Sequence, residues 1–151
     1  MALLRLVHLL GFTAWLGAGL ALMVMSIAAR SEPATSAASL ARVQWAVTRL
    51  LLLPGALLTV FSGLMLTFRL MHGSTMGNPW MVTMQGAGLV GGFIALFVAV
   101  PASARLAKLD PDVPHAAHVA RTRRTLRIAS SVNDALGLLA LVAAALYRAG
   151  A

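Results

Sequence analysis

Four long apolar stretches dominate this sequence and constrain its fold more than any other feature. Each one reaches the roughly 20 residues that a helix needs to cross the hydrocarbon core of a bilayer. None has the polar alternation of a barrel strand, and backbone groups in lipid must be satisfied within the structure. The stretches cover, approximately, residues 3–28, 47–70, 81–106 and 128–147. The sequence therefore predicts an all-α fold, a single integral membrane bundle of four transmembrane helices spanning residues 1–151.

The composition excludes a soluble or disordered chain. Hydrophobic residues make up 60% of the sequence and charged residues only 11%, whereas a soluble domain carries about a quarter charged residues. The net charge of +8 would indicate nucleic acid in a soluble protein, but here the charges fall between apolar spans. The expected environment is a lipid bilayer, and no nucleic-acid partner is expected. The absence of cysteine excludes disulfides and thiolate metal sites.

The basic residues predict an orientation. In a four-span chain the first and third loops share one face of the membrane, and the termini share the other face with the second loop. Nine Lys and Arg residues fall on the first face and three on the second, Arg5, Arg69 and Arg148. The positive-inside rule then predicts cytoplasmic first and third loops, with both termini periplasmic in a bacterial-type inner membrane. This rule explains the basic run Arg121–Arg127, which could also bind anionic lipid headgroups.

Two local signals refine the helix boundaries. Asn78 followed by Pro79 resembles an N-cap with proline at the first helical position, opening the third span. Pro54 lies within the second span and is expected to kink it, because proline removes a backbone hydrogen bond and crowds the preceding turn.

Small residues predict where the helices pack. Lipid tails are as apolar as leucine, so transmembrane helices associate through close backbone approach. Gly88 and Gly92 have GxxxG spacing in the third span, beside Gly91, and Gly17 and Gly55 offer similar positions on the first and second spans. These small residues occupy more faces than one bundle strictly requires, which is a hint of further membrane protein subunits.

Asp134 and Arg49 are ionisable residues that fall within the predicted spans. Asp134 lies about two turns into the fourth span and Arg49 lies near the start of the second, both toward the predicted cytoplasmic face. The two are interpreted as a structural ion pair that fixes helix register. The functional alternative for these residues is a quinone or proton site.

Histidine and methionine residues suggest two candidate cofactor sites on the opposite side. His8 lies about one turn inside the first span, where a neutral imidazole could ligate haem iron, although a lone histidine there can also be an interfacial residue. His72 lies between Met71 and Met76, and imidazole with thioether groups suits Cu(I). Methionine is also an ordinary filler of apolar packing.

Several of these residues form a pattern that resembles a known family. The sequence is similar to HemJ-type protoporphyrinogen oxidases and the wider CopD-like membrane superfamily, closest to its uncharacterised predicted integral membrane members. The resemblance rests on His8-Leu9-Leu10-Gly11, Trp15, Gly19-Leu20, Pro54-Gly55, Thr59-Val60, Gly63-Leu64 and Trp80. It implies a haem-associated role for His8. The essential lysine of the HemJ type corresponds to Met84, and a thioether cannot replace an ammonium group, so the oxidase activity is not implied.

Three functions follow from these observations. The leading hypothesis is a non-catalytic structural or accessory subunit of a larger membrane complex, because no catalytic constellation is present. The first alternative is a b-type haem protein in redox or porphyrin chemistry, with His8 as axial ligand. The third is a Cu(I)-handling protein that uses His72, Met71 and Met76.

Overall fold

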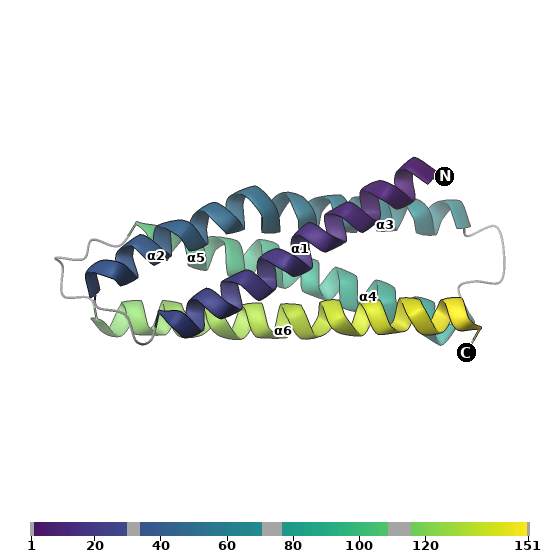
Figure 1. The fold of residues 1–151 in the computed structure, drawn as a ribbon. Helices are drawn as coiled ribbons and strands as arrows, with labels where there is room; N and C mark the ends of the chain where they lie inside the picture. Colours follow the sequence, from purple (N-terminus) through teal and green to yellow (C-terminus); the bar gives the residue numbers. More distant parts are fainter. Residues whose placement is uncertain (1, 30–33, 71–76, 109–115, 151) are drawn as a thin grey trace.

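The chain forms a bundle of four long helical segments, seen in the computed structural model, which describes residues 2–29, 34–70, 77–108 and 116–150 (Figure 1). The first segment is α1 (Ala2–Ala28) and the fourth is α6 (Ala116–Ala149). The other two are composite, each with a π-helical turn: α2 (Ala34–Val47), η1 (Thr48–Leu52) and α3 (Leu53–Leu70), then α4 (Pro79–Ile94), η3 (Ala95–Ala99) and α5 (Val100–Ala107). All four are long and apolar enough to cross a membrane, which confirms the predicted fold class.

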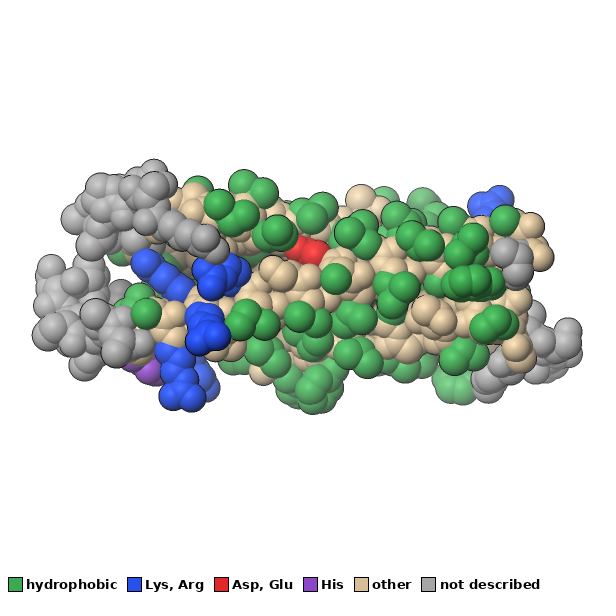
Figure 2. Space-filling model, turned by 90° about the horizontal axis from the view of Figure 1, so that it is seen from below, with side chains coloured by type: hydrophobic (Ala, Val, Ile, Leu, Met, Phe, Trp, Pro, Cys, Tyr) green, Lys and Arg blue, Asp and Glu red, His purple; other side chains and the backbone are tan. Residues whose placement is uncertain are grey.

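Both chain termini lie at the same end of the bundle (Figure 1). We call this the terminal end, and we call the opposite end, where α2 and α6 begin, the basic end. Lysine and arginine side chains cluster toward the basic end, whereas hydrophobic side chains cover the middle of the bundle (Figure 2). The large apolar residues that point outward, such as Phe61, Phe93 and Leu138, are therefore suited to contact lipid.

The second and fourth helices extend further toward the basic end than hydropathy predicts. In the structure the second and fourth segments that could cross a membrane begin at Ala38 and His118. The apolar stretches of the sequence begin later, at residues 47 and 128. Hydropathy marks where the hydrocarbon core ends, but a helix continues until a residue breaks it. No proline or glycine interrupts 34–46 or 116–127, so the basic run Arg121–Arg127 lies on the first turns of α6 rather than in a loop.

Each composite helix widens into a π turn directly before a proline. Leu53, the residue before Pro54, donates its backbone N–H to the carbonyl of Thr48. Val100, the residue before Pro101, donates its backbone N–H to the carbonyl of Ala95. Proline has no N–H to donate, and its ring crowds the preceding turn, so a wider turn accommodates it. At Pro54, where a kink was predicted, the structure shows a π turn, and the matching turn before Pro101 was not predicted from the sequence.

The side chain of Asn78 caps the third helix as predicted. Its Oδ1 atom accepts hydrogen bonds from the backbone N–H groups of Trp80, at 2.9 Å, and Met81, at 3.3 Å. Pro79 occupies the first helical position. The cap and the proline together fix where the helix begins on the terminal end.

Glycine allows α1 and α3 to cross with their backbones in contact. A Cβ atom added to Gly55 would lie 2.7 Å from the backbone nitrogen of Trp15 and 2.9 Å from the carbonyl oxygen of Gly11. A Cβ added to Gly92 would lie 2.7 Å from Val60 on α3. In contrast, a Cβ added to Gly17 meets no atom within 4 Å. Gly55 and Gly92 therefore lie at helix contacts within the chain, and Gly17 does not.

We expect Gly55→Ala to destabilise the bundle by about 1–3 kcal/mol, because its methyl group meets backbone atoms that cannot rotate away. Gly17→Ala is the matched control on an open surface and should be neutral or slightly stabilising, because alanine favours helix. Thermal unfolding of both variants in the same detergent measures the difference. Equal stabilities for the two variants would contradict the observed crossing of α1 and α3.

Candidate functional site

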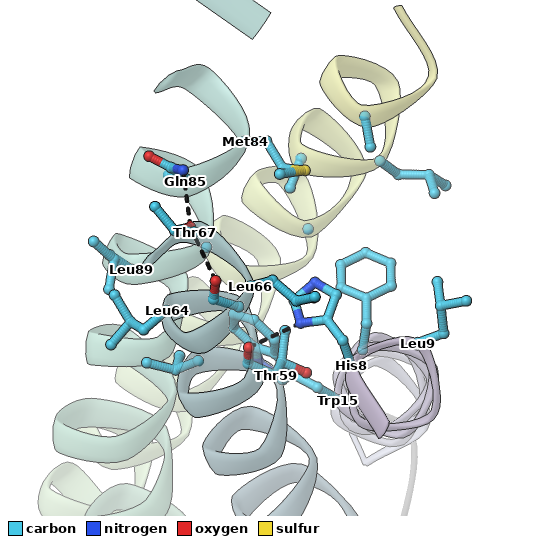
Figure 3. A pocket seen from close by; sticks show the side chains of 18 of the residues that line it. His8, Leu9, Trp15, Thr59, Leu64, Leu66, Thr67, Met84, Gln85 and Leu89 are labelled. Carbon is cyan, nitrogen blue, oxygen red and sulfur yellow. Dashed lines mark hydrogen bonds between the residues drawn. The ribbon is translucent and has the colours of Figure 1, made fainter. Parts of the chain in front are cut away.

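A cavity of about 300 Å³ opens between all four helical segments in the terminal half of the bundle (Figure 3). Its wall is mainly aliphatic and aromatic, with polar groups from His8, Thr67 and Gln85. Arg5, which is exposed, lies at its edge. A cavity of this kind, apolar with a few polar groups, is typical of small-molecule and cofactor sites.

His8 is held by α3 through one nitrogen of its ring. Its Nδ1 atom lies 3.0 Å from the backbone oxygen of Thr59 and 3.0 Å from Oγ of Ser62. A carbonyl oxygen can only accept, so the Nδ1–H group donates and the Nε2 atom is left as the free acceptor. Gly63 permits this position, because a Cβ there would lie 3.0 Å from Cε1 of His8. The imidazole ring projects into the cavity (Figure 3).

The α3–α4 side of the cavity carries a thioether and a short hydrogen-bonded chain. Met84, half-buried on α4, lines the same cavity as His8. The side chain of Gln85 donates to Oγ1 of Thr67 at 3.0 Å, and that hydroxyl donates to the carbonyl of Gly63 at 2.9 Å. Gly88 also lines this cavity and faces no atom within 4 Å, so it widens the cavity instead of forming a helix contact. Thr67 and Gln85 belong to no sequence motif and were therefore not predicted as cavity residues.

Trp15 closes the cavity toward the centre of the bundle. Its indole Nε1–H donates to Oδ1 of Asn133 on α6 at 3.1 Å, and the side chain is almost fully buried. The ring rests on Gly91 of α4, where an added Cβ would lie 3.1 Å from Cζ2. Trp15 therefore contacts α3 through its backbone, α4 through its ring and α6 through its hydrogen bond.

The predicted ion pair between Arg49 and Asp134 is wrong. Arg49 lies on the exposed side of η1, whereas the side chain of Asp134 is buried and both of its carboxylate oxygens lack a hydrogen-bond partner within the described part of the chain. The two residues share an approximate depth but not a face. Hydropathy gives depth along a helix, and the helix rotation that separates these side chains is set by packing.

A second cavity, of about 340 Å³, lies at the basic end between α1, α2, α5 and α6. Three arginines of the basic run contribute to its wall together with polar side chains of α1 and α2, namely Arg123, Arg124, Arg127, Ser26 and Gln44. Gln44 donates from Nε2 to Oγ of Ser26 at 3.3 Å. The cavity is therefore polar on the α1–α2 side and cationic on the α6 side.

The proposed copper ligands Met71, His72 and Met76 lie outside the described residues. Within the ranges that the structure describes, no group of three or more His, Cys, Asp or Glu side chains could hold a metal ion. His8, the histidine predicted as a haem ligand, lines the cavity at the terminal end.

These features define a four-helix integral membrane protein with a ligand-sized cavity inside the membrane-spanning bundle. The family model for predicted integral membrane proteins of the DUF2269 type matches residues 2–147, and the chain belongs to that family. The match carries no assignment to the HemJ/CopD-like superfamily, so the resemblance to it stays a hypothesis. No curated protein and no solved structure matched the chain.

We expect Trp15 and Asn133 to be energetically coupled. Trp15→Phe removes the N–H donor together with the ring atoms that rest on Gly91, and Asn133→Leu removes the acceptor, so only the double variant separates the hydrogen bond from the lost packing. A double-mutant cycle on unfolding in detergent should give a coupling energy of about 0.6 kcal/mol, the average for hydrogen bonds between transmembrane helices, and no more than about 1.7 kcal/mol. Strictly additive effects would contradict a hydrogen bond that stabilises the bundle.

Proposed function

We propose that this protein binds a b-type haem in the cavity at the terminal end, with His8 as axial ligand, and serves as a non-catalytic membrane redox component. The observation that carries the proposal is the orientation of His8. Its Nδ1–H is occupied by the carbonyl of Thr59, which leaves Nε2 free toward the cavity. Metal-ligating histidines almost always donate their other ring N–H in this way, which fixes both tautomer and ring direction.

Other residues of the cavity fit a haem. The wall is apolar, as a macrocycle requires, and the volume of about 300 Å³ lies at the lower limit of ligand pockets, so a whole haem would also occupy the open side of the cavity. Arg5 at the edge could pair with a propionate group, and the thioether of Met84, which lines the same cavity, could help to hold the iron. When bound, a haem held by histidine and methionine supplies one-electron transfer. The polypeptide would hold the group, exclude water and set the ring orientation of His8.

The geometry favours this function over the subunit hypothesis. That hypothesis rests on a surplus of small residues, and most of the glycines concerned are used within the chain. Gly55, Gly91 and Gly92 contact neighbouring helices, and Gly88 lines the cavity. Gly17 is left as the open position among the five. An oxidase activity of the HemJ type is not proposed, because Met84 occupies the place of the family's lysine.

We expect the purified protein, isolated with haem or titrated with hemin in detergent, to show a Soret band that His8→Ala removes or strongly shifts. No apolar residue can replace the coordinate bond of the imidazole. Met84→Leu should keep the band but alter the spectrum of the reduced form, because it changes only the second ligand. Absorption spectra of the oxidised and dithionite-reduced protein measure both effects.

The matched control is His118→Ala, which removes an exposed histidine at the other end of the bundle. It should leave the spectrum unchanged. Size-exclusion profiles and helical circular dichroism of all variants separate loss of haem from loss of fold. A folded wild-type protein that binds no hemin, or a Soret band that survives His8→Ala, would overturn the assignment.

We also propose that the basic end faces the cytoplasm of a bacterial-type cell, with both termini periplasmic. Among the described residues, more Lys and Arg lie toward the basic end of the bundle than toward the terminal end. The positive-inside rule places the end with more Lys and Arg in the cytoplasm. In this orientation Arg123, Arg124 and Arg127, which line one cavity, would lie at the anionic cytoplasmic leaflet and could bind lipid headgroups.

Reporter fusions test the orientation. An alkaline phosphatase fusion after Ala151 should be active, because that enzyme folds in the periplasm. A fluorescent protein inserted within residues 111–114 should fluoresce from the cytoplasm. The opposite pattern at either position would contradict the proposed orientation.

A further inference from the structure

Asp134 presents a carboxylate in the middle of the bundle, beside the neutral side chain of Asn133 and without a cationic partner among the described residues. The residue is only 4% exposed, and neither carboxylate oxygen has a hydrogen-bond partner among the described residues. One helical turn earlier on the same face of α6, Oγ of Ser130 is also buried and unpartnered. These three oxygen atoms are the complete set of buried side-chain polar atoms without a partner in the described chain.

The opposing helix leaves space for this carboxylate. A Cβ atom added to Gly19 of α1 would lie 1.9 Å from Oδ1 of Asp134 and 3.3 Å from Nδ2 of Asn133. Any larger residue at position 19 would displace the acid. The glycine thus forms one wall of the niche that holds this carboxylate.

No fixed cation of the described chain is paired with Asp134. On α1 the charged or titratable residues are Arg5 and His8, both at the terminal end, and α4 and η3 carry none. On α5 the basic residue is Arg105, in the last turn. On α6 itself the nearest is Arg127, seven residues away, or about 10 Å along the helix axis.

A bare carboxylate in a membrane interior is costly, and a neighbour of opposite charge normally compensates it. Neutralising the carboxylate of Asp134 requires one positive charge, and no described residue supplies it. We propose that Asp134, with the hydroxyl of Ser130, forms a reversible intramembrane binding site for a single monovalent cation, a proton or a sodium ion. This site is separate from the haem cavity and does not depend on it.

The sequence of α6 places the site in line with the cavity at the basic end. The helix carries three polar residues on one stripe, because their spacings are three and four residues: Arg127, Ser130 and Asp134. Arg127 lines the second cavity, with Ser26 and Gln44 opposite. A proton delivered by water in that cavity would pass along this stripe, bind one carboxylate oxygen to form the neutral acid, and return to water on release.

Labelling with dicyclohexylcarbodiimide tests the site directly. This hydrophobic reagent adds covalently to protonated carboxyl groups, and Asp134 is the one acid within the predicted spans. The purified wild-type protein in detergent is treated across a range of about pH 5 to about pH 8. Peptide mass spectrometry then gives the rate of modification at Asp134 and, for comparison, at the remaining acids, Glu32, Asp110 and Asp112.

We expect Asp134 to be modified at low pH, with a rate that falls about tenfold per pH unit above the midpoint of its titration. Replacing N-methylglucamine chloride by sodium chloride at constant ionic strength separates the two cations. A lower rate in sodium identifies sodium as a competing occupant, whereas an unchanged rate identifies the proton alone.

Two variants serve as matched controls. Ser130→Ala should shift the midpoint, because it removes the neighbouring oxygen, and Arg49→Leu should leave it unchanged, because that side chain faces outward. An unmodified Asp134 at the lowest pH in folded protein, or a rate that is constant over the whole range, would overturn the proposal. An unchanged midpoint in Ser130→Ala would contradict the two-residue site.

Discussion

The packing of Trp15 against three neighbouring helices is the constraint on which the rest of the structure depends. In lipid the helices gain little from burying apolar surface, so close contact and polar contacts between helices must hold them together. Trp15 supplies both: its backbone touches Gly55, its ring touches Gly91, and its indole N–H binds Asn133. A Cβ atom at Gly55 would displace the backbone of Trp15, and one at Gly91 would require its ring to shift by a few tenths of an ångström.

This packing also separates two regions with different chemistry. On the terminal side of Trp15 lies the apolar cavity with His8, and on the other side lies Asp134, adjacent in sequence to the residue that binds the indole. Asn133 thus contributes to the wall between the candidate haem cavity and the buried carboxylate. A haem that accepts an electron and an acid that accepts a proton would lie on either side of this wall, within one bundle.

The polar side chains within the bundle are mostly satisfied by the backbone of their own helix. Thr48, Thr59 and Thr67 each donate to the carbonyl four residues earlier. This arrangement allows hydroxyl groups in a membrane segment at little cost. His8 and Asp134 depart from that pattern, since His8 leaves one ring nitrogen free and Asp134 leaves both oxygens unpartnered. Such departures from local satisfaction are where function is expected in a membrane protein.

The sequence by itself determined the fold class, the number of spans and the N-cap at Asn78, because span length, hydropathy and capping are local properties of the chain. It also identified His8 and Asp134 as residues of interest, because ionisable groups in apolar stretches are conspicuous. It could not determine the rotation of each helix about its axis, so it wrongly paired Arg49 with Asp134. Rotation depends on which small residues meet across helices, as at Gly55 and Trp15, and only the tertiary structure decided it. The same rotation brought His8, Met84 and Gln85 from separate helices to one cavity, a juxtaposition that no local pattern in the sequence contains.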